Sequence, residues 1–264
     1  MKKHYIELWL LLCIAFAVFA AASAFDMPVI AGHQLKSSEI AGTLFHKPTE
    51  TPVAEQEDST DAQNVTEAVT FPVPCDTASK TILFIGDSML EGLGPRMAAY
   101  ADHNHHTLYE VMWYSSTSEV WGKSDKLKKY IAQLRPDYIF ISLGANELFV
   151  SDIARKRDAY VKQIISDIDT IPYVWIGPPN WKPDTGINDL IGANTPSGTF
   201  FVSNGMHFDR SKDGAHPTRQ SAAQWMDSVA RWMPGNCLHP IRMEIPEKAS
   251  SRAKRIFVHQ PNEK

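Results

Sequence analysis

Short apolar runs and helical patterns alternate along the chain from Lys80 onward, and this alternation limits the possible folds more than any other feature. The apolar runs, rich in β-branched and aromatic residues, are 81–85, 107–113, 137–143, 173–177 and 199–203. The helical patterns cover residues 89–102, 124–134, 152–168 and 218–233. Strands that alternate with helices predict parallel βαβ units. We therefore expect an α/β fold, a three-layer α/β/α sandwich with a mostly parallel, doubly wound sheet.

The predicted sheet and its helices form a single domain, residues 79–236. Residues 26–78 are rich in proline and acidic side chains. They have too little apolar surface to offset the entropy lost on ordering, which predicts a disordered linker. Residues 237–264 include several basic side chains and are predicted to form a solvated C-terminal tail.

The first 25 residues have the pattern of an export signal. Two lysines at positions 2 and 3 precede an apolar run over residues 8–25, which ends in Ala22-Ser23-Ala24. That small-x-small ending is typical of a signal-peptidase site. The run also has about the length of a short membrane span. Residues 1–25 are therefore either a cleaved signal peptide or a retained membrane anchor, and in both cases the domain is expected to be periplasmic or otherwise outside the cytoplasm.

Four polar, turn-rich segments follow the predicted strands or precede the last helix. They are residues 86–88, 144–147, 178–186 and 213–218. In doubly wound sheets, ligands bind outside the carboxyl ends of the strands. These segments are therefore expected to meet at one edge of the sheet, where they bring together Ser88, Asn146, Asp213 and His216.

Acyl transfer needs the kinds of side chain that these segments contain. A serine hydroxyl is a weak nucleophile until an imidazole takes its proton, and a carboxylate must hold that imidazole. Asp213 and His216 lie three residues apart and can meet across a Gly-Ala turn. The developing oxyanion needs fixed donors, each worth roughly 3 kcal/mol. The backbone N–H of Ser88 at a helix N-terminus and the side-chain amide of Asn146 are the candidates.

These motifs resemble the SGNH, or GDSL-type, hydrolase family over about residues 80–233. The Gly-Asp-Ser of the family's first block corresponds to residues 86–88, so its catalytic serine falls on Ser88. The family's asparagine donor falls on Asn146, and its final Asp-x-x-His falls on Asp213 and His216. The resemblance implies a flavodoxin-like α/β/α domain and an exported bacterial esterase. The pentapeptide G-x-S-x-G is absent from the chain, which argues against the α/β-hydrolase fold.

The chain departs from the family pattern at two positions. The family's second block supplies a glycine N–H as a third oxyanion donor, but residues 116–118 contain no glycine, and Gly122 lies too far along the chain. Any residue except proline can donate this hydrogen bond, so Thr117 or a neighbour is the candidate. The third block also has Glu147 where the family has aspartate, and we expect Glu147 to be a structural hydrogen-bond acceptor.

Three further residues are candidates for substrate contact. They are Asp87 beside the nucleophile, Trp181 in the segment after the strand at 173–177, and Trp121. Tryptophan rings can stack on sugars, although packing in the core is their more common role. His207 and Asp209 lie close in sequence to the predicted catalytic pair, and the family spacing favours Asp213 and His216 over them.

The composition argues against several other functions. The net charge of −4 gives no basic face for nucleic acid. The histidines at 103, 105 and 106 do not have the spacing of a tetrahedral metal site, and neither a metal nor another cofactor is expected. Three cysteines are too few for a disulfide-rich scaffold. Cys75 and Cys237 flank the predicted domain, and export would permit a disulfide between them.

Together these features predict an exported serine esterase that acts through an acyl-enzyme. The resemblance implies that its substrate is an ester, most simply an O-acetyl group, on a carbohydrate or cell-wall glycan. The same fold and residues also serve O-acyltransferases and hydrolases of lipid esters or thioesters. A catalytically inactive, anchored glycan-binding protein is the alternative from a different class. The sequence does not indicate an oligomeric state.

Overall fold

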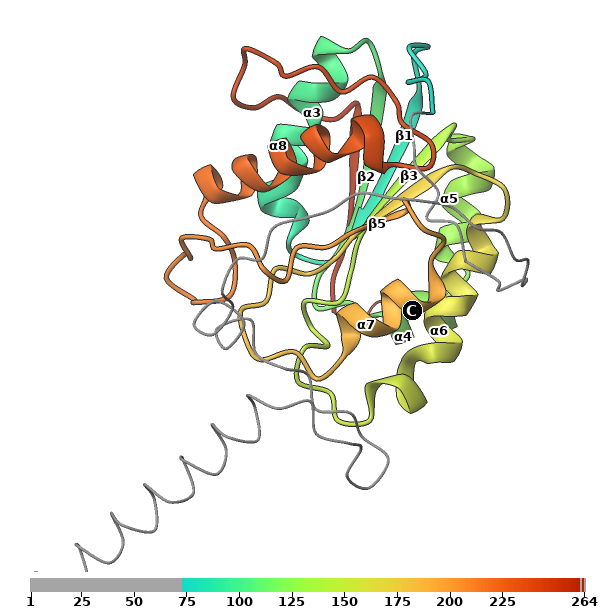
Figure 1. Cartoon of the computed structure of the whole chain (residues 1–264). Coiled ribbons are helices and arrows are strands. Elements are labelled where there is room, and N and C mark those ends of the chain that lie inside the picture. Colours follow the sequence, from blue (N-terminus) through green and yellow to red (C-terminus); the bar gives the residue numbers. More distant parts are fainter. Residues whose placement is uncertain (1–72, 262, 264) are drawn as a thin grey trace, which may run out of the picture. The chain divides into compact units, whose positions relative to one another are not determined.

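The computed structural model describes residues 73–261 and residue 263, which form one compact unit. The predicted signal or anchor, and nearly all of the predicted linker, lie outside the described residues. The elements, labelled as in Figure 1, are β1 (Thr81–Gly86), α3 (Leu90–His103), β2 (Thr107–Trp113), α4 (Ser118–Lys123), α5 (Lys126–Leu134), β3 (Tyr138–Ser142), α6 (Ile153–Ile168), β4 (Tyr173–Ile176), α7 (Ile187–Asn194), β5 (Phe200–Phe201), α8 (Arg219–Asn236) and β6 (Arg255–His259).

The six strands form one sheet in the order β5-β4-β3-β1-β2-β6, and every neighbouring pair is parallel. The chain leaves β1 for β2 on one side and then crosses to β3 on the other side. The carboxyl end of β1 is therefore the topological switch point, where ligands bind in sheets of this kind. Ser88 follows β1 by two residues.

Successive residues of each strand contribute to two different hydrophobic cores. In β1, Ile82 and Phe84 pack with α3 and α8, whereas Leu83 and Ile85 pack with α4, α5, α6 and α7. Figure 1 shows these two groups of helices on opposite faces of the sheet. All four of these side chains are fully buried. Because both faces are covered, a strand here is apolar along its whole length instead of alternating.

The structure confirms the predicted fold class, a three-layer α/β/α sandwich with a doubly wound parallel sheet. Strands β1 to β5 coincide with the five predicted runs to within one residue at each end or lie inside them, and the helices at 90–103, 126–134 and 153–168 agree with their predictions closely. Backbone angles inside α8 are non-helical at Pro234 and Gly235, so its regular part ends at Met233, where the periodicity predicted. Helices α4 and α7 were not predicted, because each is too short to show a clear apolar period.

The prediction that residues 237–264 form a solvated tail outside the domain is wrong. Within residues 237–264, β6 pairs with β2 from Tyr109↔Arg255 to Trp113↔His259 and extends the sheet beyond the predicted boundary at 236. Ile256 and Val258 are 44% and 46% exposed, so β6 covers little of the core. Its apolar run, residues 256–258, was too short to be recognised as a strand in the sequence.

The predicted disulfide is also not formed. Cys75 is exposed and Cys237 is buried, and both thiols are free. The two ends of the domain nevertheless meet: the N–H of Asp76 donates to the carbonyl of Pro240 at 2.8 Å, and that of Arg242 donates to the carbonyl of Asp76 at 3.0 Å. Backbone pairing therefore joins these ends without a covalent bond.

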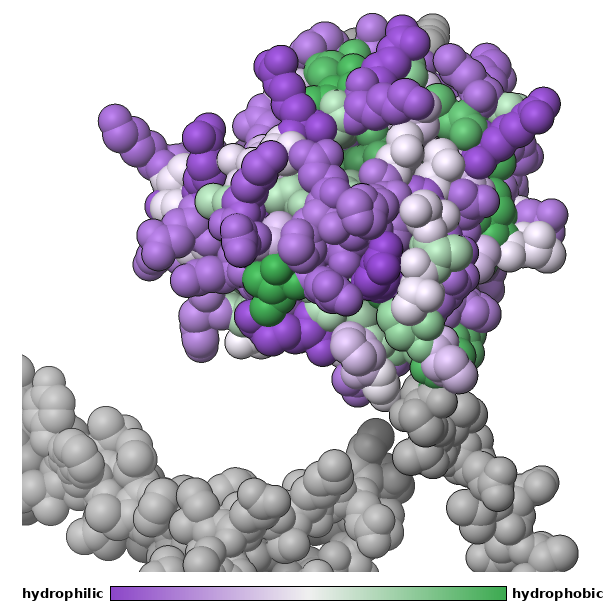
Figure 2. Space-filling model, turned by 90° about the horizontal axis from the view of Figure 1, so that it is seen from above, coloured by the Kyte–Doolittle hydropathy of each residue, from purple (hydrophilic) through white to green (hydrophobic). Residues whose placement is uncertain are grey.

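The surface is largely polar. Figure 2 shows a face on which hydrophilic residues predominate and apolar ones form small separate patches. Among residues 73–261 and 263, the large apolar side chains that are exposed are Val73, Phe149, Val202, Ile245, Ile256 and Val258. Among the residues that the structure describes, no helix is both long and apolar enough to cross a membrane.

Candidate active site

Ser88 is held at the carboxyl end of β1 by a turn that requires glycine just before it. A side-chain carbon on Gly86 would lie 2.5 Å from the carbonyl oxygen of Ser142 in β3 and would also overlap Leu90. The N–H of Asp87 donates to the same Ser142 carbonyl at 3.2 Å. The chain then enters α3, so Ser88 stands at the edge of the sheet, at the N-terminal end of the helix.

His216 reaches Ser88 across 128 positions of sequence. Its Nε2 lies 2.8 Å from the Oγ of Ser88, and its Nδ1 lies 2.7 Å from Oδ2 of Asp213. With the proton on Nδ1 donated to the carboxylate, Nε2 is free to accept the serine proton. The structure thus brings the predicted nucleophile, base and carboxylate into one hydrogen-bonded chain.

The turn that contains Asp213 is itself built by hydrogen bonds. Oδ1 of Asp213 accepts from the backbone N–H groups of Ala215 and His216 at 2.8 and 3.0 Å. These bonds, led by the one from the His216 N–H, hold the pKa of the Asp213 carboxyl well below its ordinary value. The carboxylate therefore stays ionised and can orient the imidazole.

Arg210 joins this turn to the neighbouring loop. Its guanidinium donates to the carbonyl of Ala215 at 2.7 Å and, over longer distances of 3.4 and 3.3 Å, to the carbonyls of Pro179 and Asn180. The loop that contains His216 is thereby held against the segment at 178–186. Sequence reasoning did not identify Arg210, because its partners are backbone carbonyls distant in sequence.

Three N–H groups are the candidate donors to an oxyanion. Nδ2 of Asn146 donates one hydrogen to the carbonyl of Ser116 at 3.0 Å, which leaves its second hydrogen available. Within residues 73–261 and 263, the backbone N–H groups of Ser88 and Thr117 donate no hydrogen bond. The N–H of Ser118, by contrast, is taken by Glu147 at 2.8 Å. Thr117 is thus the member of the 116–118 segment with a free donor.

Glu147 is a buried acceptor that ties three segments together. Its Oε1 accepts from Oγ of Ser118 at 2.8 Å and from Nε of Arg157 at 2.7 Å, in addition to the backbone bond from Ser118. Burial raises the pKa of the Glu147 carboxyl, while the Ser118 and Arg157 contacts act in the opposite direction. Glu147 is therefore a structural acceptor, as expected, and it holds the start of α4 beside Asn146.

Two of the predicted substrate contacts are wrong. The side chain of Trp121 is completely buried, and its Nε1 donates to Oγ of Ser116 at 3.0 Å. Asp87 is also fully buried; its Oδ1 accepts from the N–H of Met89 at 2.9 Å. Burial raises the pKa of Asp87 to about 7. Because both are buried, neither side chain is accessible to a substrate. Each instead supports the backbone next to Ser88 or Thr117.

Trp181 is placed beside the site. Its Nε1 donates to the carbonyl of Ala145 at 2.9 Å, next to Asn146, and its ring packs against both hydrophobic cores. The edge of its ring meets Phe149, with the centroids 6.3 Å apart. Phe149 was not identified from the sequence, where a phenylalanine in a loop has no distinguishing pattern.

The competing pair is not assembled. His207 is exposed and, among the described residues, forms no hydrogen bond or ion pair. Asp209 takes part in backbone pairing, where its carbonyl accepts from the N–H of Thr218 at 2.7 Å. Of the histidine cluster, His106 is buried and bonded through both ring nitrogens to the backbone of Lys80 and Arg242.

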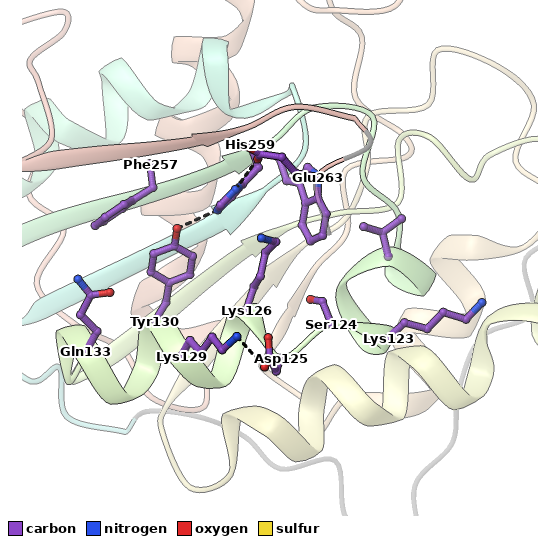
Figure 3. A pocket seen from close by; sticks show the side chains of 12 residues that line it. Lys123, Ser124, Asp125, Lys126, Lys129, Tyr130, Gln133, Phe257, His259 and Glu263 are labelled. Carbon is purple, nitrogen blue, oxygen red and sulfur yellow. Dashed lines mark hydrogen bonds and ion pairs between the residues drawn. The ribbon is translucent and has the colours of Figure 1, made fainter.

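A cavity of about 750 Å³ lies between α4, α5 and β6 (Figure 3). None of the four candidate catalytic and oxyanion side chains lines it. Figure 3 shows Tyr130 directed at His259, with Oη and Nε2 2.8 Å apart, and Lys129 directed at Asp125, also at 2.8 Å. The polar groups of this cavity bind one another, and none of them belongs to the candidate catalytic set. The cavity therefore takes no part in the chemistry proposed at Ser88.

Comparisons with known proteins yield distant structural similarities. No protein-family model and no curated protein matches the chain. The esterase EstA from Pseudoalteromonas sp. is 18% identical over 58% of this chain and 97% of its own, with a TM-score of 0.42. TesA is 17% identical over 56% and 95%, with a TM-score of 0.44. A family 3 carbohydrate esterase from Clostridium thermocellum is 18% identical over 60% and 100%, with a TM-score of 0.41.

Proposed function

We propose that this chain is a serine esterase of the SGNH type that hydrolyses its substrate through an acyl-enzyme. The observation that supports this most directly is the pair of short contacts made by one imidazole: Nε2 of His216 to Ser88 at 2.8 Å and Nδ1 to Asp213 at 2.7 Å. A hydroxyl, an imidazole and a carboxylate in this order form the nucleophile, base and orienting group of acyl transfer. Their position at the switch point of the sheet favours a binding site over a chance contact.

In the proposed reaction, Oγ of Ser88 attacks the ester carbonyl while Nε2 of His216 takes the hydroxyl proton. The carbonyl oxygen becomes an oxyanion, which accepts hydrogen bonds from the N–H groups of Ser88 and Thr117 and from Nδ2 of Asn146. His216 then gives its proton to the departing alkoxide, and the acyl group stays on Ser88. Water then attacks the acyl-enzyme while His216 takes its proton. His216 returns this proton to Oγ of Ser88 as the carboxylic acid leaves.

The proposed substrate is an O-acyl group, most simply acetyl, on a carbohydrate or cell-wall glycan. The open surroundings support a substrate larger than the acyl group, since His216 and Trp181 are both partly exposed. An alcohol in place of water as the acceptor would make the chain an O-acyltransferase with the same residues, so the product must be identified.

Hydrolysis of 4-nitrophenyl acetate and labelling by a fluorophosphonate are the direct tests of this proposal. We expect turnover by the wild type and an adduct located on Ser88 by mass spectrometry, with both absent in Ser88→Ala. Acetate release should then be compared across acetylated xylan, peptidoglycan and mannan. Loss of the acetyl group without free acetate would indicate transfer to an alcohol. A wild type that is neither labelled nor active would contradict the esterase proposal.

We further propose that the domain is exported. The support is the basic flank and apolar run of residues 1–25, which has the pattern of a signal peptide or anchor. Fractionation of expressing cells tests this: full-length protein in the cytosol would contradict it. N-terminal sequencing of the exported form would then distinguish cleavage after Ala24 from a retained anchor.

A further inference from the structure

A lysine ammonium rests on two aromatic rings beside the candidate oxyanion site. Nζ of Lys182 lies 4.6 Å from the ring centroid of Trp181 and 5.2 Å from that of Phe149. The Phe149 side chain is 55% exposed, which is unusual for a phenylalanine. Contact with the faces of two rings favours a restricted set of positions for a side chain that is otherwise flexible.

Hydrogen bonds place this group of side chains close to the proposed chemistry. Thr185 donates through its N–H and its Oγ1 to the backbone of residues 148–150, at 2.8 and 2.7 Å. Trp181 donates to the carbonyl of Ala145 at 2.9 Å, one residue before Asn146. The loop at 178–186 is therefore joined to the loop that contains the oxyanion donor. The Lys182 ammonium thus lies over a ring that is itself bonded next to Asn146.

The charge of Lys182 is not neutralised by a neighbouring carboxylate. In the part of the chain that the structure describes, no ion pair includes Lys182, and its contacts are the two rings. The nearest acid in sequence, Asp184, is occupied: it accepts from the backbone N–H groups of residues 186–188 at 2.8 to 3.2 Å. Its negative charge therefore compensates the N-terminus of α7.

We propose that Lys182, held on Trp181 and Phe149, binds an anionic group of the ester substrate, a carboxylate or a phosphate. This inference rests on the proposed esterase function and narrows it to acidic substrates. A rigidly supported cation beside a site attracts and orients an anion, and it does so mainly through electrostatic complementarity. The two rings would also offer apolar surface to the part of the substrate that carries the charge.

The test compares three acetate esters that differ in charge. They are 4-acetoxybenzamide, which is neutral, 4-acetoxybenzoate, which carries a carboxylate, and 4-acetoxyphenyl phosphate. We expect Lys182→Gln to lower kcat/KM for the anionic esters about three- to fivefold at low salt and to leave the neutral ester unchanged, as for an exposed charge pair. Lys182→Arg should keep the preference. A comparison of kcat/KM for 4-acetoxybenzoate and 4-acetoxyphenyl phosphate identifies which anion, carboxylate or phosphate, the site favours.

Lys254→Gln is the matched control. Nζ of Lys254 lies 5.5 Å from the ring centroid of Tyr109, near the amino end of β2 and so at the opposite edge of the sheet from Ser88. This variant makes the same change in net charge at a lysine supported in the same way. If both variants reduce hydrolysis of the anionic esters equally, the change in the protein's net charge explains the loss. The proposal that Lys182 binds the anion is then wrong. Phe149→Leu, which removes one ring, should give a smaller loss than Lys182→Gln.

A binding measurement separates this inference from the esterase proposal. Saturation-transfer NMR with 4-acetoxybenzoate can be carried out on Ser88→Ala, with and without Lys182→Gln. We expect a signal that falls when Lys182 is replaced and when salt is raised, since exposed charges are screened. Failure of hydrolysis with this signal intact would contradict the esterase proposal alone. An anion-to-neutral ratio that Lys182→Gln leaves unchanged, or a signal that it leaves unchanged, would overturn the inference.

Discussion

The backbone N–H of Ser118 donates to Oε2 of Glu147 at 2.8 Å. Glu147 follows Asn146 directly, and Ser118 follows Thr117, so this one bond holds two of the proposed oxyanion donors next to each other. Arg157 fixes the other carboxylate oxygen at 2.7 Å and so limits its movement. The glutamate that departs from the family pattern is therefore the residue that joins the two donor loops.

Glu147→Gln should lower kcat about tenfold with little change in KM, because displaced donors stabilise the transition state less than fixed ones. The free energy of unfolding should also fall by about 1–3 kcal/mol as Arg157 loses one of its two ionic partners. Steady-state kinetics and thermal unfolding measure the two effects. Glu119→Gln is the control, since Glu119 also pairs with Arg157, at 2.7 Å, but does not bond Ser118. Equal losses of kcat in both variants would contradict a positioning role for Glu147.

Ser88→Ala and His216→Ala should each remove nearly all hydrolysis, by about 10⁴-fold or more, and leave the unfolding temperature close to that of the wild type. Asp213→Ala should be damaging but less complete, because the carboxylate acts through the imidazole. Single-turnover and steady-state rates on 4-nitrophenyl acetate are the measurement. His207→Ala should retain activity. Loss of turnover in His207→Ala, with His216→Ala still active, would show that the base is wrongly assigned.

Asn146→Ala should reduce kcat by roughly 10²- to 10³-fold while KM changes little, since its free Nδ2 hydrogen is used mainly in the transition state. The same amide donates to the Ser116 carbonyl at 3.0 Å, so unfolding should be measured alongside to separate catalysis from loop stability. A raised KM with kcat unchanged would instead indicate that Asn146 binds the ground state.

Glu110→Gln should stabilise the domain at pH 8 and have little effect at pH 4. Burial raises the pKa of Glu110 in β2 to about 7, and no hydrogen bond to its carboxyl forms among the described residues. A group with a raised pKa favours the folded state below its unfolded pKa, about 4.3. That stability is lost as pH rises through about 7. Denaturant unfolding from pH 4 to pH 8 should show a gap between variant and wild type that grows to at most about 3 kcal/mol.

Iodoacetamide should label Cys75 in the native protein without reductant and should reach Cys237 only after unfolding. The structure leaves both thiols free, one exposed and one buried. Burial raises the pKa of both thiols, and this slows their reaction at neutral pH. Peptide mass spectrometry distinguishes them from Cys13. If neither Cys75 nor Cys237 reacts, even after unfolding, until a reductant is added, the two cysteines form a disulfide after all.

Much of the fold and the core of the site follow from local sequence patterns. The apolar run at 81–85 ends in Gly-Asp-Ser, and the structure has a strand there followed by Ser88 at the switch point. Asp213 and His216 were expected to meet because they lie only three positions apart, and they do. Such features depend on neighbours along the chain, whose periodicity and turn chemistry can be read directly.

The remaining features depend on packing between distant segments. Trp121 and Trp181 are the same residue type and both were candidates for substrate contact, yet Trp121 is completely buried in α4 and Trp181 lies beside the site. The strand β6 exists because β2 offers an unpaired edge, and the Thr117 donor is free because Glu147 takes the next N–H along. The sequence alone therefore determined the order of the first five strands and the longer helices, and the residues that follow these strands. Only the tertiary structure decided which of those residues are exposed, paired or free, since burial and hydrogen bonding are properties of the packed chain.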